Sequence, residues 1–135
     1  MNKYIVSVFL FFIGMSSISV TNAEIRHGLW RFETSIEMTG MPMKMPPQSG
    51  TFCVKKGNYM PDQKRMKKGC KYKQEKDGNN ISWHMSCANP KMEAKGNMKY
   101  SGRRMQGSSV ATVYRRGKKV LMTTKINGQY LGSCK

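Results

Sequence analysis

The stretch ISWHMSCANPKMEAKGNMKY, residues 81–100, predicts the fold of the chain. Apolar and polar side chains alternate from Ile81 to Cys87 and again from Met92 to Tyr100. Alternation with a period of two is typical of a β-strand that buries one face. Asn89-Pro90 separates the two runs and predicts a turn. We therefore expect two strands joined by a turn.

The same alternation recurs on both sides of this stretch. Strands are also expected at residues 30–38, 49–54, 70–76, 105–115, 119–126 and 129–134. The turn signals between them are Asp77-Gly78-Asn79-Asn80, Ser101-Gly102, Arg116-Gly117 and Asn127-Gly128. The predicted fold is all-β, mainly an antiparallel meander of about eight strands curled into a half-open or closed barrel.

One segment favours a helix. Residues 61–69 begin with Pro61 and Asp62, carry bases in the last turn and end at Gly69. We expect one short helix there, and an irregular, proline-broken stretch over residues 39–49.

The N-terminal segment has the order of a secretory signal peptide. Lys3 precedes an apolar run over residues 5–13, and the segment ends in Thr21-Asn22-Ala23. The run is too short to span a bilayer permanently, and no later one is longer. Residues 1–23 are therefore predicted to be a signal peptide. Residues 24–135 would form a single periplasmic or secreted domain with no transmembrane segment.

Cys53, Cys70, Cys87 and Cys134 are separated by 16, 16 and 46 residues. An even number of cysteines in a small exported domain predicts two disulfides, and no CxxC pair supports the competing zinc site. We favour Cys53–Cys70 with Cys87–Cys134, because the first would close the helical excursion and the second would fasten the last strand. The best rival is Cys70–Cys87, because a hairpin centred on Gly78-Asn79 would place these two residues opposite each other.

Counting strand directions predicts which residues share an end of the sheet. Strict alternation, with the helix returning the chain to its starting end, brings all four cysteines to one end. Lys55, Lys56 and the turn at Arg116-Gly117 would lie at that same end. The loop after Met38 would lie at the other end, near Arg103 and Arg104.

The chain is strongly basic, with 24 Lys and Arg, 7 Asp and Glu, and a net charge of +17. Residues 1–23 hold one base and no acid, which leaves +16 on residues 24–135. Such a field attracts polyanions, although a merely soluble surface is the competing interpretation. The candidate anion-binding residues are Lys64, Arg65, Lys67, Lys68, Arg115, Arg116, Lys118 and Lys119. The expected partner is an anionic glycan, lipopolysaccharide or lipid, and no motif indicates a specific nucleic acid.

Methionine is unusually frequent, with 13 residues in the chain. Met38, Met41, Met43 and Met45 lie within eight residues of one another. Thioethers are soft ligands that suit Cu(I), so this loop is a candidate metal site. The alternative is that these adaptable side chains pack over the mouth of the sheet.

No pattern of catalytic residues stands out. Glu33 and Glu37 share a strand face but lie about 13 Å apart, too far for a carboxylate dyad. His27 and His84 have no nucleophile signature beside them. We therefore expect a non-enzymatic protein without a cofactor that binds an anionic envelope component, with Cu(I) binding as the alternative. The ligand's identity and the oligomeric state are left open.

The chain resembles a family of small exported bacterial proteins known as domain of unknown function 3617. The matching features, in order, are Gly28-Leu29-Trp30, MTGMPMKMP at residues 38–46, Cys53, Cys70, Trp83, Cys87 and the closing Gly132-Ser133-Cys134. The resemblance implies an exported β-rich domain with structural cysteines. It implies no activity, ligand or functional residue.

Overall fold

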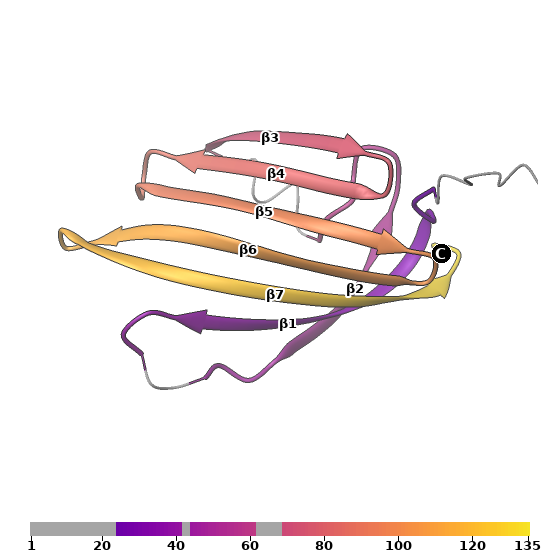
Figure 1. Cartoon of the computed structure of the whole chain (residues 1–135), viewed down its shortest axis with the longest axis horizontal. Coiled ribbons are helices and arrows are strands. Elements are labelled where there is room, and N and C mark those ends of the chain that lie inside the picture. The colour runs from indigo at the N-terminus through magenta and orange to yellow at the C-terminus, as the bar shows by residue number, and fades with distance from the viewer. Residues whose placement is uncertain (1–23, 42–43, 62–68) are drawn as a thin grey trace, which may run out of the picture.

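A computed structural model describes residues 24–41, 44–61 and 69–135, and in these residues the chain forms one antiparallel sheet of seven strands (Figure 1). The strands are β1 (Gly28–Met38), β2 (Gln48–Val54), β3 (Cys70–Asp77), β4 (Asn80–Cys87), β5 (Met92–Ser101), β6 (Arg104–Arg115) and β7 (Lys118–Gly132). Their order across the sheet is β2-β1-β7-β6-β5-β4-β3. The prediction of an all-β antiparallel protein is confirmed.

The sheet is open. β2 and β3 are its two edges, and the described residues do not pair them with each other, so the closed barrel is wrong. The chain leaves the sheet after Val54 and places Tyr59 and Met60 against the buried face instead of extending that edge. The described residues contain no helix, and the helix predicted over residues 61–69 falls almost entirely outside them.

The predicted turn at Asn127-Gly128 is wrong, and the last two predicted strands form the single strand β7. Asn127 and Gly128 pair with β1 on one side and with β6 on the other. A Cβ on Gly128 would lie 2.2 Å from Cε of Met105. The glycine therefore makes room for a neighbouring side chain within a strand, and it does not reverse the chain.

Strand parity divides the sheet into two faces. The inner face carries most of the apolar residues of the strands, such as Trp30, Ile81 and Met98, and these are buried or half-buried. The outer face carries the alternate positions, which are mostly polar and exposed. Residues 55–61 cross the inner face, and we call this segment the strap.

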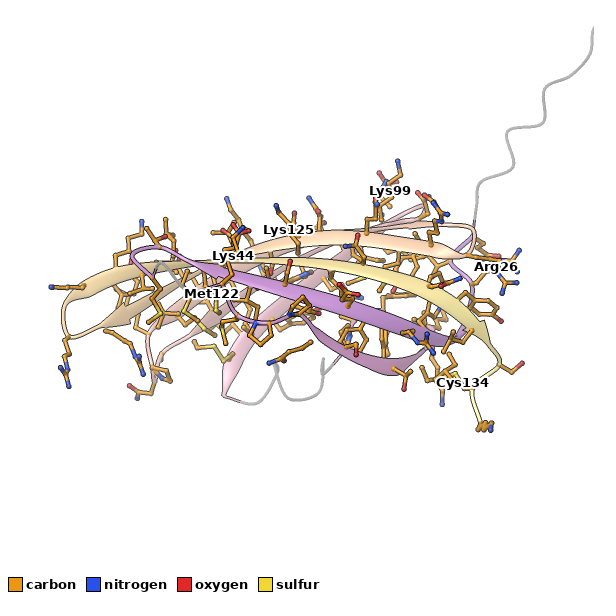
Figure 2. The ribbon with its side chains drawn as sticks, turned by 90° about the horizontal axis from the view of Figure 1, so that it is seen from below. Arg26, Lys44, Lys99, Met122, Lys125 and Cys134 are labelled. Atoms are coloured by element: carbon orange, nitrogen blue, oxygen red, sulfur yellow. A yellow bond between two sulfur atoms is a disulfide. The ribbon has the colours of Figure 1, made fainter. Side chains whose placement is uncertain are left out.

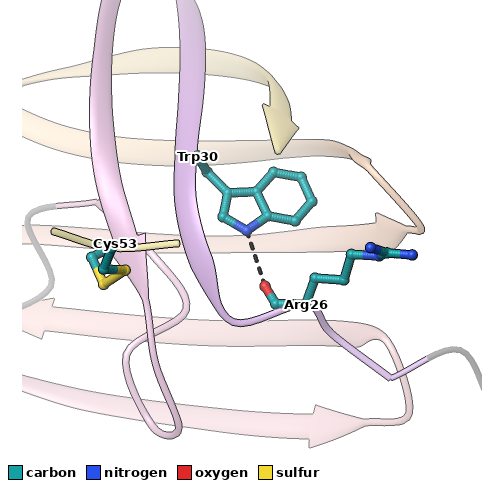
Figure 3. The surroundings of a disulfide bond; sticks show 4 residues. Arg26, Trp30 and Cys53 are labelled. Atoms are coloured by element: carbon teal, nitrogen blue, oxygen red, sulfur yellow. Dashed lines mark hydrogen bonds between the residues drawn. A yellow bond between two sulfur atoms is a disulfide. The ribbon is translucent and has the colours of Figure 1, made fainter. Parts of the chain in front are cut away.

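Trp30 forms the centre of the core. Its ring packs edge-on against Tyr100 at 5.1 Å and against Tyr130 at 5.5 Å between ring centroids. Its indole Nε1–H donates to the carbonyl oxygen of Arg26 at 3.0 Å (Figure 3). β1, β5, β7 and the segment before β1 are therefore held together by one buried side chain.

Tyr100 fastens the strap to the sheet. Its hydroxyl donates to the carbonyl oxygen of Tyr59 at 2.5 Å, between residues 41 positions apart. Burial, assisted by the neighbouring Tyr59 phenol, raises the pKa of Tyr100 well above its ordinary value of 10.0. The hydroxyl therefore stays protonated and remains a donor at neutral pH.

Two disulfides are present, as predicted, but the favoured pairing is wrong. The bonds are Cys53–Cys134 and Cys70–Cys87, so the rival hairpin pairing is the one that forms. Cys70 and Cys87 are direct partners across β3 and β4. Cys53 ends up near Cys134 because β2 and the end of β7 lie on either side of β1.

The two disulfides lie at opposite ends of the sheet. Cys87 pairs with Met92, close to the turn between β6 and β7, and we call this the hairpin end. Cys53 pairs with Leu29 at the other end, which we call the Cys53 end. The prediction of four cysteines at one end fails because β2 ends at the Cys53 end whereas β3 begins at the hairpin end. This change of end reverses the expected direction of the strands from Cys70 to Ile126, and residues 129–134 keep theirs because the predicted turn before them does not form.

No helix in the described part of the chain is both long enough and apolar enough to cross a membrane.

Removing the long-range disulfide should cost more stability than removing the local one. The cysteines are 81 residues apart in Cys53–Cys134 and 17 apart in Cys70–Cys87. Loop-closure entropy then gives about 4.5 and about 3 kcal/mol. Urea unfolding of Cys53→Ala/Cys134→Ala and Cys70→Ala/Cys87→Ala measures the difference. Equal losses would contradict the entropic account.

Tyr100→Phe should destabilise the protein by about 1–3 kcal/mol, because it leaves the buried carbonyl of Tyr59 without its donor. Tyr114→Phe is the matched control, since it removes the same atom from an exposed ring and should change stability by less than about 0.5 kcal/mol. Denaturant unfolding of both variants tests the strap attachment. Equal effects would show that the Tyr59–Tyr100 bond does not hold it.

Candidate functional site

The β6–β7 hairpin carries four of the eight predicted anion-binding residues. Arg116 and Gly117 form its turn, with φ angles of 48° and 74° that match the twist of a tight hairpin. Arg115 and Lys118 are the last paired residues, and Lys119 follows. All four basic side chains are exposed. The local sequence alone is enough to bring them together.

The tip of this hairpin extends beyond the neighbouring strands (Figure 1). β5 begins at Met92 opposite Val113, and β1 ends at Met38 opposite Met122. Beyond the pairing of β6 with β7, residues 115–120 therefore have no further strand of the described chain beside them. The four bases face solvent from a projecting ribbon.

Strand register adds three bases that sequence reasoning missed. Lys95 pairs with Val110, and Lys125 pairs with Ser108 on the same outer face. The ammonium group of Lys91 lies 5.0 Å from the centroid of the Tyr114 ring. The seven bases together form what we call the hairpin-end patch: Lys91, Lys95, Arg115, Arg116, Lys118, Lys119 and Lys125. Lys91, Lys95 and Lys125 are distant in sequence from the turn, so only the strand register could have placed them beside it.

Two acids share this part of the outer face. Glu93 pairs with Thr112, and Glu37 pairs with Thr123. This region therefore holds seven bases and two acids. Because neighbouring charges add within a Debye length of about 8 Å at physiological salt, the patch keeps a strong positive potential. Its chemistry is that of a multivalent cationic surface.

The charge of the strands is concentrated on one side of the sheet. Figure 2 shows Lys99 and Lys125 pointing to the same side, with Met122 on the other. Along β4 to β7, between the strand ends, every charged side chain occupies an outer-face position. The sheet therefore presents a basic surface to solvent and an apolar one to the core.

The remaining predicted bases have different positions. Lys64, Arg65, Lys67 and Lys68 lie outside the described residues. Lys55 and Lys56 follow Val54, which pairs with Gly28, so they lie at the Cys53 end and not beside the hairpin as predicted.

Arg103 and Arg104 lie opposite to the hairpin, as expected, because Arg104 pairs with Gln129. The guanidinium of Arg103 is 5.5 Å from the ring centroid of Tyr130, so this base already makes a cation–π contact within the protein.

The loop after Met38 lies at the hairpin end, and its predicted position near Arg103 is wrong. The amide of Thr39 donates to the carbonyl oxygen of Leu121 at 2.9 Å, which ties the start of the loop to β7. Met38 and Met122 are direct cross-strand partners. From the sequence, Met122 is expected only as a core residue on the inward face, because it is 84 positions from Met38 and only register joins them.

The described residues include two of the other three loop methionines. Met41 and Met45 are exposed, and Met43 lies outside the described residues. Met38, Met41 and Met122 therefore lie at the same corner of the sheet. The described residues contain no cluster of three or more His, Cys, Asp or Glu side chains that could hold a metal ion.

Hollows interrupt both faces of the sheet, and two of them adjoin the surfaces described above. One of about 340 Å³ lies on the outer face toward the Cys53 end, where Arg31 and Arg104 share it with Glu33. The other, of about 160 Å³, lies under the strap between Met60 and Trp83. The carboxylate makes the first less favourable for anions than the hairpin-end patch, and the second is lined mainly by apolar atoms.

Trp83 also stacks on Tyr72, with ring centroids 6.4 Å apart. Burial raises the pKa of Tyr72 to about 12. Its protonated hydroxyl donates to Oε1 of Gln74 at 2.9 Å and approaches the sulfur of Met60 at 3.5 Å. This phenol therefore contributes to the packing beneath the strap.

Comparison with known proteins supports the resemblance seen in the sequence. The family model described as "Protein of unknown function (DUF3617)" matches residues 25–134. The chain matches no curated protein and no solved structure. The match covers all seven strands and all four cysteines. The protein therefore belongs to the DUF3617 family.

Proposed function

We propose that this protein acts outside the cytoplasm, in the periplasm or after secretion, and binds an anionic component of the cell envelope without catalysing a reaction. The hairpin-end patch carries the proposal, because four exposed bases at a projecting turn lie next to three more on the outer face. A multivalent cationic surface of this kind concentrates polyanions and speeds their association. Anionic glycan, lipopolysaccharide and anionic lipid all present the required charge.

The two disulfides support the location. Disulfides persist in oxidising compartments such as the periplasm and the exterior of the cell. Both pairs link structured parts of the sheet, and the described residues leave no free cysteine. The signal-peptide pattern of residues 1–23 supports the same location.

A second candidate is Cu(I) binding at the methionine corner. The observation that favours it is the register that places Met122 directly opposite Met38, next to the loop that bears Met41. Thioether ligands suit Cu(I), and the corner is accessible because Met41 is exposed.

Neutralising the hairpin should weaken binding to lipopolysaccharide. Each base near an anionic surface contributes about 1 kcal/mol, so Arg115→Gln/Arg116→Gln/Lys118→Gln/Lys119→Gln should lose at least about tenfold in affinity. Titration at low salt measures the loss, and added salt should weaken binding of the unaltered protein.

The matched control for this variant is Lys55→Gln/Lys56→Gln/Arg103→Gln/Arg104→Gln. It removes the same charge from exposed residues at the Cys53 end. We expect a much smaller loss from it. Equal losses from the two variants would show a diffuse charge effect, and undetectable binding at low salt would refute the proposed function.

Replacing Met38, Met41, Met43 and Met45 by leucine should abolish Cu(I) uptake measured against a competing chelator, and Met122→Leu alone should weaken it. Leucine and methionine are close in volume, so folding should change by less than about 1.5 kcal/mol. Met98→Leu, in the buried core, is the control and should leave Cu(I) uptake unchanged. Absence of Cu(I) uptake by the unaltered protein would end this second candidate.

A further inference from the structure

Exposed apolar side chains are gathered at the hairpin end. Val110, Tyr114 and Leu121 are 40%, 41% and 37% exposed and lie on the outer face of β6 and β7. Leu121 pairs with Thr112, which stands between Val110 and Tyr114 along β6. Diagonal neighbours in an antiparallel pair lie about 7–8 Å apart, so the three side chains form one cluster. We call it the apolar triad.

This clustering is specific to one end of the molecule. The other large apolar side chains that are exposed in the described residues are Met41, Met45 and Leu131. Met41 and Met45 belong to the loop between β1 and β2, which lies at the same end (Figure 1). Only Leu131 lies at the Cys53 end. An exposed group of apolar residues with a polar rim marks an interaction site more often than scattered single residues do.

The rim of the triad is cationic. Lys95 pairs with Val110, Lys119 pairs with Tyr114, and the ammonium group of Lys91 lies 5.0 Å from the Tyr114 ring centroid. Lys125 lies on the same face, two residues beyond the partner of Val110. The triad therefore sits within the hairpin-end patch, and the same surface offers both apolar contact and positive charge.

This combination matches the surface of an anionic lipid bilayer. Apolar side chains can enter the boundary between headgroups and acyl chains, while long basic side chains reach the phosphates. Tyrosine is enriched at this depth because its ring is amphipathic. The tip also projects beyond its neighbouring strands, so no adjacent strand would prevent its approach.

We propose that the outer face of the hairpin end docks on anionic lipid bilayers, with the apolar triad at the headgroup boundary and the outer-face lysines Lys91, Lys95, Lys119 and Lys125 on the lipid phosphates. This inference rests on the proposed function and names anionic lipid as its ligand. A soluble anionic glycan would use the charge alone. The contribution of the triad therefore separates the two ligands.

The test compares binding to two probes at the same salt concentration. One is a vesicle of phosphatidylglycerol and phosphatidylcholine, and the other is heparin in solution. Leu121→Thr should weaken vesicle binding about fivefold, because it removes apolar surface that the bilayer would bury. The triple variant Val110→Thr/Tyr114→Thr/Leu121→Thr should weaken it at least about fiftyfold. Heparin binding should stay within about twofold for both.

Leu131→Thr is the matched control, because Leu131 is also on β7 and is 41% exposed. It should leave vesicle binding unchanged. Vesicles of phosphatidylcholine alone should bind weakly. Thermal unfolding checks each variant, and the single pair Leu121→Thr and Leu131→Thr decides the question if the triple variant does not fold.

The outcomes distinguish the two proposals. Heparin binding without vesicle binding, or equal vesicle affinities for Leu121→Thr and Leu131→Thr, would overturn lipid docking and leave the anion-binding function standing. Equal binding to charged and neutral vesicles would also overturn it, because the bases would then contribute nothing. Failure to bind heparin, lipopolysaccharide and anionic vesicles at low salt would overturn both.

Discussion

The single sheet of this protein buries one of its two faces, and Trp30 lies at the centre of the buried side chains. Its ring packs against Tyr100 of β5 and Tyr130 of β7, and its N–H is satisfied by the carbonyl of Arg26. Tyr100 in turn holds the carbonyl of Tyr59 in the strap. The strap therefore takes the place of a second sheet, and it covers the inner face with a few apolar residues from an irregular segment.

This arrangement makes the two ends of the sheet different. At the Cys53 end, a disulfide ties β2 to the end of β7, and the guanidinium groups of Arg26 and Arg103 lie near the Tyr130 ring at 5.8 and 5.5 Å. At the hairpin end, β6 and β7 continue beyond their neighbours and leave bases and apolar side chains in water. Exposed apolar side chains lower the solubility of a protein. Because they are concentrated at one end, we infer that this end has a binding role. The physical basis of the proposed function is this asymmetry.

Period-two alternation also separates charge from apolar surface. Because adjacent positions point to opposite faces, a strand that buries its apolar residues places its lysines on the outer face. Cross-strand register then decides which lysines meet. Lys95 and Lys125 reach the same region from β5 and β7, although 30 positions separate them. The same geometry brings Met122 opposite Met38 and gives the methionine corner a member from outside the loop.

The sequence by itself determined the strands, most of the turns, the even set of disulfide-forming cysteines and the basic turn at Arg116-Gly117. These are local properties, set by side-chain alternation and by residues that favour tight turns. The strand directions, the disulfide partners and the full membership of the hairpin-end patch were decided only by the tertiary structure. Packing of Tyr59 and Met60 holds the strap, residues 55–61, against the inner face, and pairing on both sides keeps Asn127-Gly128 extended. Both depend on contacts between residues far apart in the chain, which no local pattern records.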